Sequence, residues 1–389
     1  MTSEKQQNGP LTGLKVIDLT TVVMGPYASQ TLAEYGADVV KIEAPGGDST
    51  RQIGPSREPG MASLFLAVNR NKRSVVLDLK TATGRDDLLA LVRGADVFMH
   101  NMRPDKLLAL GLGVGCLREL NPRLVFAQLT GFSSDGPYAG LPAYDDIIQG
   151  LSGLAAMMEK QSGMPRYMPT TLADKVGSLA AVGAIMAALL RRAATGEGAT
   201  VEVPMFETVV SFGLVEHAQG SLFDPPASDI GYRRAFAADR KPFATVDGHV
   251  CVMPYSDAHW QSLLAALEDE EANEDPRFAT LAARTANIEL LYERLAAHLR
   301  NRTSADTLSL CRRLDIPSAP MNRLEDLRRD PHLLAVKHFM PVEDEAMGTL
   351  VFPANPVSFD GWKARPQVPP RLGADTESVL AAVLKDGLK

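Results

Sequence analysis

The chain has 389 residues, of which 45% are hydrophobic and 22% are charged, a composition typical of a globular protein with a substantial core. The formal net charge of −7 argues against a general nucleic-acid binder, so an anionic ligand would need local clusters of Lys and Arg. The three cysteines are far apart and the seven histidines are scattered, which indicates reduced thiols and no metal site.

The N-terminal segment and the apolar runs indicate where the protein works. Residues 1–10 are polar and lack the apolar stretch of a signal peptide. The longest apolar run, at 179–190, is rich in Ala and Gly and is short for a membrane span. We therefore expect a cytoplasmic protein that binds neither a membrane nor nucleic acid.

The first third of the chain alternates short apolar runs with helical stretches, which predicts an α/β fold with a large, doubly wound (Rossmann-like) parallel sheet. Strands are expected at 14–20, 37–44, 74–79, 96–101 and 124–132, and helices at 25–36, 84–95 and 103–111. Such sheets bind ligands beyond the carboxyl ends of their strands. The loops that could hold a ligand are 21–25, 43–51, 101–106 and 130–144.

The usual dinucleotide-binding glycines are absent from the predicted first turn, which reads TTVVMGP. The glycine-rich stretch GLGVG at 111–115 follows a helix, so we interpret it as a helix-ending turn.

A change of composition near residue 224 predicts a second domain. We expect a large domain over 10–222 and 340–389, a smaller α+β domain over 235–328, and linkers at 223–234 and 329–339. Within the small domain, 243–254 has the pattern of a β-hairpin with Asp247 and Gly248 at its turn.

Between residues 168 and 190, a single acidic residue, Asp174, stands at the entrance to a long, small-residue, apolar helix. Its carboxylate could cap the helix by accepting a backbone N–H. It could instead be a nucleophile that forms an acyl intermediate. Local pattern alone leaves both interpretations open.

The order of motifs along the chain resembles the class III CoA-transferases, a family typified by formyl-CoA transferase and carnitine CoA-transferase. The resemblance covers nearly the whole chain from Leu11. It rests on LKVIDLT, VMGPYASQ, GADVVKIE, NRNKRSVVLDLK, HNMRPDKLLALGLG, YDDIIQGLSG, PTTLADKVGSLAAVGAIMAALLRRAATGEG and VEVPMFE in that order.

The resemblance implies that Asp174 is the catalytic nucleophile, with Tyr144 and Asp145 close to it. The aspartate would attack an acyl-CoA thioester, form a mixed anhydride, and then carry CoA as an aspartyl thioester. α-Methylacyl-CoA racemase shares the fold and uses a histidine at the position of Tyr144. A racemase or epimerase of 2-methylacyl-CoA is therefore the weaker alternative, and a non-catalytic CoA-binding protein is another.

The resemblance also implies a CoA site, with CoA bound as a substrate rather than as a tightly held cofactor. The residues carried over by position are Val22, Leu77, Lys80, Asn101, Met102 and Met205, with Arg51, Arg73, Arg103 and Lys106 as charged neighbours. Leu77 and Met205 could equally be core residues. The basic turn at 69–73 could equally be a solvated surface.

The partners implied are an acyl-CoA, such as succinyl-CoA or another dicarboxylate donor, and a small carboxylic acid. Arg166, Arg233 and Arg234 could each pair with a distal carboxylate or simply lie on the surface. The family forms interlocked, ring-like homodimers, and the same arrangement is expected here. The segment Asp247–His249 matches a mobile loop of the family, with His249 as a lid or a turn residue.

Overall fold

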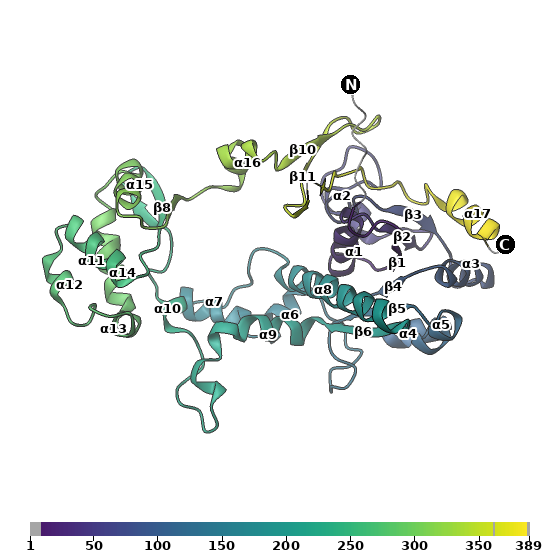
Figure 1. The fold of residues 1–389 in the computed structure, drawn as a ribbon, viewed down its shortest axis with the longest axis horizontal. Helices are drawn as coiled ribbons and strands as arrows, with labels where there is room; N and C mark the ends of the chain where they lie inside the picture. Colours follow the sequence, from purple (N-terminus) through teal and green to yellow (C-terminus); the bar gives the residue numbers. More distant parts are fainter. Residues whose placement is uncertain (1–8, 361, 387–389) are drawn as a thin grey trace. The chain divides into compact units, whose positions relative to one another are not determined.

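A computed structural model describes residues 9–360 and 362–386, with side chains up to residue 383. Contacts divide the chain into two units (Figure 1). The first unit contains the chain up to Ser152, Pro169–Phe212, and the chain from Pro331; the second contains Gly153–Met168 and Gly213–Asp330.

These units differ from the predicted domains at their edges. Residues 153–168 and 213–222 group with the second unit, and residues 331–339 group with the first. The predicted large domain also includes residues 361 and 387–389, which lie outside the described part of the chain.

A six-stranded parallel sheet forms the centre of the first unit, which confirms the predicted parallel α/β architecture (Figure 1). Its strands are β1 (Lys15–Leu19), β2 (Asp38–Glu43), β3 (Arg73–Val76), β4 (Val97–His100), β5 (Val125–Thr130) and β6 (Ala199–Pro204). Their order is β3-β2-β1-β4-β5-β6. The order reverses between β1 and β4, which is where doubly wound sheets open a crevice for a ligand.

Helices cover both faces of this sheet. One face carries α3 (Ala82–Arg93), α4 (Pro104–Ala109), α5 (Val114–Leu120) and α17 (Thr376–Asp386). The other carries α1 (Met24–Glu34) and α8 (Leu172–Thr195). Shorter helical segments are α2 (Ser63–Val68), α6 (Asp145–Leu151) and the 3₁₀ turn η1 (Ser49–Gln52), and the longer α9 (Met205–His217) follows β6. Alternation along β1 explains the two layers, because Ile17 faces the α3 side and Asp18 faces α1.

The glycine-rich stretch lies between α4 and α5. Gly111 follows the end of α4 with φ of +75°, a conformation that favours glycine, and Gly113 is the residue before α5. The stretch therefore ends one helix and begins the next, as the sequence predicted.

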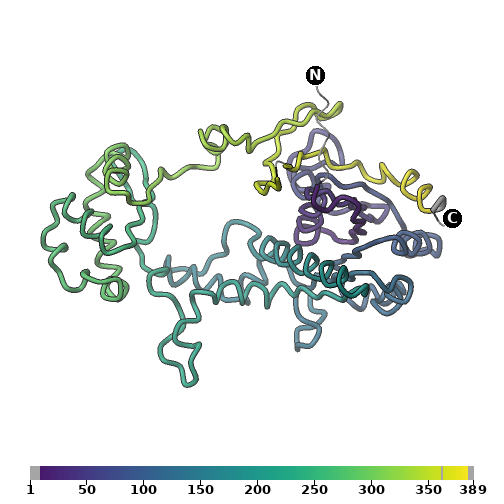
Figure 2. Tube along the Cα trace, viewed as in Figure 1, coloured from purple at the N-terminus to yellow at the C-terminus, as the bar shows by residue number. Residues whose placement is uncertain are grey.

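The C-terminal segment returns to the first unit, and Figure 2 shows its yellow trace beside the purple N-terminal part. It contains α16 (Pro331–Ala335), β10 (Phe339–Val342), β11 (Leu350–Pro353), β12 (Ser358–Phe359) and β13 (Trp362–Lys363) before α17. The Asp375 carboxylate accepts the Ser74 backbone N–H at 2.8 Å, which ties the start of α17 to β3.

The second unit is a small α+β body with its own core. Its elements are α7 (Leu154–Ser162), η2 (Gln219–Leu222), α10 (Arg233–Phe236), β7 (Phe243–Thr245), β8 (Gly248–Val252), α11 (Asp257–Ala266), α12 (Glu270–Glu274), α13 (Leu281–Ala286), α14 (Ile288–Leu299), α15 (Ser304–Arg313), β9 (Ser318–Pro320) and η3 (Leu324–Arg329). The strands form one antiparallel sheet, and Trp260 and Tyr292 lie in the core beneath it.

The predicted hairpin is present, but its turn lies one residue earlier than expected. Thr245 pairs with Gly248, so Val246 and Asp247 form the two-residue loop and Gly248 begins β8. His249 pairs with Ala244 inside the hairpin. The interpretation of His249 as a turn residue is therefore wrong.

Helix α8 is long and apolar enough to cross a membrane by length and composition alone. In this fold it packs against α1, α6, β5 and β6, as the core helix of an α/β unit does. Length and composition are thus weak evidence for a membrane span here.

A layer of buried charges lies between the sheet and the loops at its carboxyl edge. The Lys72 ammonium donates to Asp18 at 3.1 Å, and the Lys41 ammonium donates to Asp48 at 2.9 Å and to the Thr20 carbonyl at 2.8 Å. All four charged side chains are fully buried. Burial alone would raise the pKa of Asp18, but Lys72, Lys41 and two hydroxyl donors outweigh it and lower the pKa to about 2.

Removing one partner of this layer tests its contribution to stability. We expect Lys72→Met to lower the free energy of unfolding by about 3–5 kcal/mol at pH 7, because Asp18 stays buried without its nearest cation. Since folding lowers the pKa of Asp18, its stabilising effect is present above its ordinary value of 3.8 and is lost as the pH falls towards 2. Urea unfolding should show most of the loss restored in Lys72→Met/Asp18→Asn. A loss below about 1 kcal/mol for Lys72→Met would contradict this account.

Candidate active site

A cavity of about 710 Å³ opens at the carboxyl edge of the sheet, where the strand order reverses. It is lined by the segments that follow β1 and β4, by the ends of β5 and β6 with the residues after them, and by the start of α8. The lining residues are Thr21, Val22, Met24, Asn101, Met102, Arg103, Pro104, Asp105, Leu129, Thr130, Gly131, Phe132, Ser134, Ala139, Gly140, Leu141, Pro142, Ala143, Tyr144, Asp174, Glu202 and Met205. Three of the four loops predicted to hold a ligand contribute to it, and the fourth, at 43–51, does not line it.

The side chain of Asn101 joins the two loops that flank the reversal point. Its Nδ2 donates to the Thr21 carbonyl at 2.8 Å, and its Oδ1 accepts the Thr21 backbone N–H at 3.0 Å. The amide therefore pairs with both the backbone N–H and the backbone carbonyl of one residue, Thr21. This pairing fixes the loop after β4 against the loop after β1.

The turn between β1 and α1 is strained at Val22, whose φ is +71°. A β-branched residue rarely adopts this left-handed conformation, which costs about 1–3 kcal/mol. The Asp48 carboxylate accepts the Val22 backbone N–H at 3.4 Å and is itself held by Lys41. The buried charge layer thus supports the cavity wall that Val22 forms.

Asp174 is the third residue of α8, and the residue before the helix is Thr171. Asp174 is therefore not the N-cap, so the capping interpretation left open by the sequence does not describe its position. Asp174 is only 8% exposed to solvent, yet it lines the cavity. Burying an ionised carboxylate without a charged partner costs folding free energy, so its presence beside a cavity points to a function.

The packing of α8 against α1 fixes where Asp174 lies. Ser178, one turn further along α8, donates its hydroxyl to the Met24 carbonyl at the start of α1. A Cβ added at Gly177 would come within 2.6 Å of the Met24 side chain, so glycine permits this close approach.

Asp145 lies between the starts of two helices. It is the first residue of α6, and its Oδ1 accepts the Asp174 backbone N–H at 3.1 Å. Because the first N–H groups of a helix have no partner within the helix, Asp145 caps α8 from outside. The prediction placed Asp145 and Tyr144 close to Asp174. Asp145 makes this direct contact, and Tyr144, 68% exposed, lines the same cavity.

The surroundings of Asp174 disfavour its charged form. Burial first, and then the negative charge of Asp145, raise the pKa of Asp174 to about 6; Lys175 and the Met24 backbone lower it in part. Two neighbouring carboxylates in which one has a raised pKa are a frequent feature of functional sites. At neutral pH the Asp174 carboxylate is still mostly ionised, and among the described residues it forms no ion pair.

Five of the residues carried over for CoA binding line this cavity: Val22, Asn101, Met102, Arg103 and Met205. Arg103 stands at the loop before α4, is exposed, and makes no side-chain hydrogen bond or ion pair within the described residues. Among the described residues that line the cavity, Arg103 is the one arginine or lysine. The geometry therefore leaves Arg103 available for an anionic ligand.

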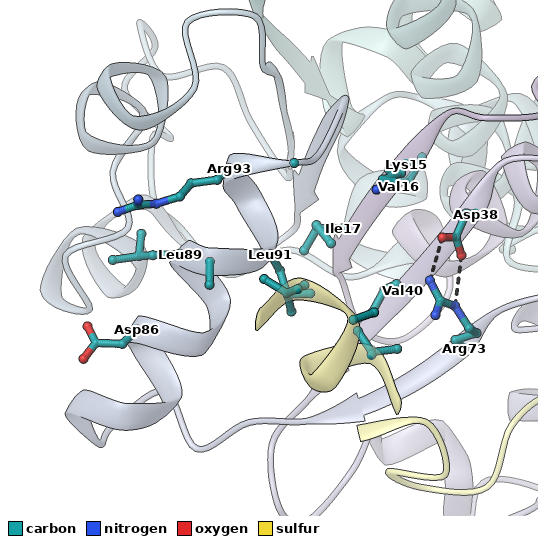
Figure 3. A pocket seen from close by; sticks show the side chains of 15 residues that line it. Lys15, Val16, Ile17, Asp38, Val40, Arg73, Asp86, Leu89, Leu91 and Arg93 are labelled. Carbon is teal, nitrogen blue, oxygen red and sulfur yellow. Dashed lines mark hydrogen bonds and ion pairs between the residues drawn. The ribbon is translucent and has the colours of Figure 1, made fainter. Parts of the chain in front are cut away.

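Arg51 and Arg73, two of the charged residues named for the CoA site, do not line this cavity. The Arg51 guanidinium is buried, donates to both oxygens of Glu43 at 2.7 and 2.8 Å, and stacks on the Phe65 ring. Arg73 begins β3, and a residue that begins a parallel strand lies at the opposite edge from those that follow it. Figure 3 shows its ion pair with Asp38 beside a second cavity at that opposite edge.

Leu77, Lys80 and Lys106 also lie outside the lining. Leu77 is a core residue under α3, which matches the alternative interpretation kept for it. Lys80 is exposed after β3, the edge strand, which β2 and β1 separate from the reversal point. The Lys106 side chain is 60% exposed on α4. Charge and motif position did not distinguish these residues from those that face the cavity.

Sequence reasoning missed two side chains that support the site. Glu202, on β6, accepts the Gln128 side-chain amide and the Ser134 backbone N–H, both at 3.0 Å, and so anchors the loop that closes the cavity. Gln149 contacts Asp145. A spacing of four residues on a helix signals that Asp145 and Gln149 share a face, and this signal was available in the sequence.

Comparisons with known proteins agree with this architecture. The family described as CoA-transferase family III matches residues 11–376. The succinate–glutarate CoA-transferase of Agrobacterium fabrum is 32% identical over 391 residues, covering 98% of this chain and 97% of that protein. The acetyl-CoA:oxalate CoA-transferase of Acetobacter aceti is 34% identical over 366 residues, covering 93% of this chain and 92% of that protein.

A solved structure shows the same fold. The crystal structure of a CAIB/BAIF family protein from Brucella suis superposes with a TM-score of 0.80 at 30% identity, covering 97% of this chain and all of that chain. The family match and these relatives extend over nearly all of the chain. The chain therefore belongs to CoA-transferase family III, and the protein is a CoA-transferase.

Proposed function

We propose that the protein moves CoA from an acyl-CoA thioester to a free carboxylic acid through covalent intermediates on Asp174. The observation that carries the proposal is a cavity-lining carboxylate that is buried, unpaired by a cation, and placed at the start of α8. The raised pKa of Asp174 means that its charged form destabilises the folded protein. A carboxylate whose role was only to stabilise the helix would not have this property.

The proposed steps balance without an external base. The Asp174 carboxylate attacks the thioester carbonyl, the C–S bond breaks, and a mixed anhydride and CoA thiolate form. The thiolate then attacks the aspartyl carbonyl carbon, which releases the first acid and leaves an aspartyl-CoA thioester. The second acid attacks this thioester, and the returning thiolate cleaves the new anhydride to give the product acyl-CoA and free Asp174.

The racemase alternative receives no support from the site. Moving a proton on and off the α-carbon needs two groups with suitable pKa values. Tyr144 occupies the position that the resemblance gives to histidine, and no histidine lines the cavity within the described residues.

The relatives support a dicarboxylic acid as one substrate. Their names refer to succinate and glutarate, oxalate, and malate. We propose succinyl-CoA as a donor and a small dicarboxylate as an acceptor.

Two of the arginines considered for pairing with a distal carboxylate, Arg166 and Arg234, belong to the second unit. There the Arg234 side chain donates to the Tyr292 hydroxyl at 2.8 Å.

We also propose that the protein is an interlocked homodimer, as the resemblance implies. Large apolar side chains on two helices are exposed to solvent in a single chain: Leu179 and Leu190 on α8, and Phe212 and Val215 on α9. A partner subunit that covered them would remove this apolar surface from water.

The variant Asp174→Asn tests the nucleophile. We expect transfer from succinyl-CoA to glutarate to fall by about 10⁴-fold or more, because an amide cannot form the anhydride. In the unmodified protein, hydroxylamine added during turnover should convert Asp174 to a hydroxamate that peptide mass spectrometry detects. Transfer at an undiminished rate by Asp174→Asn would contradict the proposal.

The same variant gives a test of folding that is independent of activity. The raised pKa means that the folded state prefers protonated Asp174, so its charge destabilises folding above pH 6 and has no effect below its ordinary value of 3.8. We expect Asp174→Asn to raise the free energy of unfolding by about 1–3 kcal/mol at pH 8 and to leave it unchanged near pH 4. Equal effects at both pH values, measured by urea unfolding, would contradict the electrostatic account.

Arg103 is proposed to bind the phosphates of CoA. We expect Arg103→Ala to raise the KM for succinyl-CoA by about tenfold with little change in kcat, because the contact is the same in the ground and transition states. Arg93→Ala is the matched control, since Arg93 is an exposed arginine at the opposite edge of the sheet. An equal effect of the two substitutions would show that general surface charge, and not Arg103, attracts the donor.

A further inference from the structure

Gln149 lies behind the two aspartates and is fully buried. Its Nε2 donates to Asp145 Oδ2 at 2.6 Å and to the Thr170 carbonyl at 3.2 Å. The two N–H groups of one amide therefore connect α6 to the segment that leads into α8. This arrangement also fixes the orientation of the amide, because a carbonyl oxygen turned towards the Asp145 carboxylate would repel it.

The Asp145 carboxylate is held from two sides. Oδ2 accepts from Gln149 on its own helix, and Oδ1 accepts the backbone N–H of Asp174. With both oxygens engaged, the carboxylate has little freedom to rotate. This contact acts together with the packing of α8 against α1 to hold the first turn of α8, from which the Asp174 side chain projects.

We propose that Gln149 is a positioning residue for the nucleophile and acts through Asp145. This inference rests on the proposed role of Asp174 and names a residue that lies within the YDDIIQGLSG motif but does not line the cavity. Gln149 touches no substrate atom in this account. It holds Asp145 in the rotamer that caps α8, and so it fixes the angle from which Asp174 meets a thioester in the cavity.

The charged groups around Asp174 leave room for an uncharged hydrogen-bond donor at position 149, which Gln149 provides. Asp145 faces it from α6 and Lys175 follows it on α8; the Met24 backbone faces it from α1, while Glu202 on β6 is held by Gln128 and Ser134. Gln149 donates a hydrogen bond to Asp145 and carries no charge, so it holds this carboxylate without placing a cation beside Asp174. An acidic residue at the same place would need a proton to make the same bond.

The test begins with Gln149→Met, which keeps the length of the side chain and removes both donors. We expect the rate of acylation by succinyl-CoA, measured by rapid quenching and hydroxylamine trapping at Asp174, to fall by about 10–100-fold, as misplaced catalytic groups do. The affinity for CoA should stay within about twofold, since Gln149 does not line the cavity. Gln30→Met is the matched control, because Gln30 is also fully buried but lies on α1 and contacts Arg70.

A double-mutant cycle separates positioning from general damage. In an Asp145→Ala background, Gln149→Met should slow acylation by no more than about twofold, because the group through which it acts is gone. If the two substitutions slow acylation by independent, multiplying factors, the inference is wrong. A fall smaller than about twofold for Gln149→Met alone would also overturn it.

Gln149→Glu gives a second readout that packing alone would not move. The protonated Glu side chain can donate to Asp145 as the amide does, whereas the ionised side chain repels it. We expect the acylation rate of Gln149→Glu, divided by that of Gln149→Met, to rise as the pH falls from 8 to 6. A ratio that does not change with pH would overturn the inference. If Gln149→Met fails to fold, the same comparison is made between Gln149→Glu and the unmodified protein.

The outcomes distinguish this inference from the proposed function. If the unmodified protein never forms a trapped adduct at Asp174, the proposed function fails. If it forms the adduct but the Gln149 and Asp145 substitutions act independently, only the positioning role of Gln149 fails.

Discussion

The hydrogen bond from the Asp174 backbone N–H to the Asp145 carboxylate joins the starts of α8 and α6, and the rest of the site depends on it. It caps a helix that has no side-chain cap of its own. It also brings two carboxylates together in a buried place, which raises the pKa of the one that lines the cavity. The contact that caps α8 therefore also positions the carboxylate that we propose as the nucleophile.

The sheet supplies the second constraint. Its strand order reverses between β1 and β4, and Asn101 ties the two loops at that point. Beneath them, Lys41 and Asp48 hold the turn in which Val22 adopts a strained conformation. The charges in this layer are paired with one another, and their contacts support the cavity wall. The cation that we propose for ligand binding, Arg103, is a separate and exposed residue of the lining.

The sequence predicted the parallel sheet and the cavity edge because apolar runs and their loops follow from local periodicity. It did not separate Arg51 and Arg73 from Arg103, since the partners of a cation depend on tertiary contacts. Arg51 pairs with Glu43 inside the charge layer, and Arg73 precedes its strand and so lies at the opposite edge. Asp174 was identified by its motif, whereas its burial beside Asp145 needed the arrangement of α6 and α8.

The central claim is that Asp174 forms an anhydride with each of the two acids, and this requires its carboxylate to exchange oxygen atoms with them. Turnover of succinyl-CoA with glutarate labelled with ¹⁸O in its carboxylates tests this directly, because cleavage of the second anhydride leaves an acceptor oxygen on the enzyme. The account predicts ¹⁸O in the peptide that contains Asp174 and, after further turnovers, in the released succinate. An unlabelled peptide after many turnovers would show that the acid attacks the thioester without passing through Asp174.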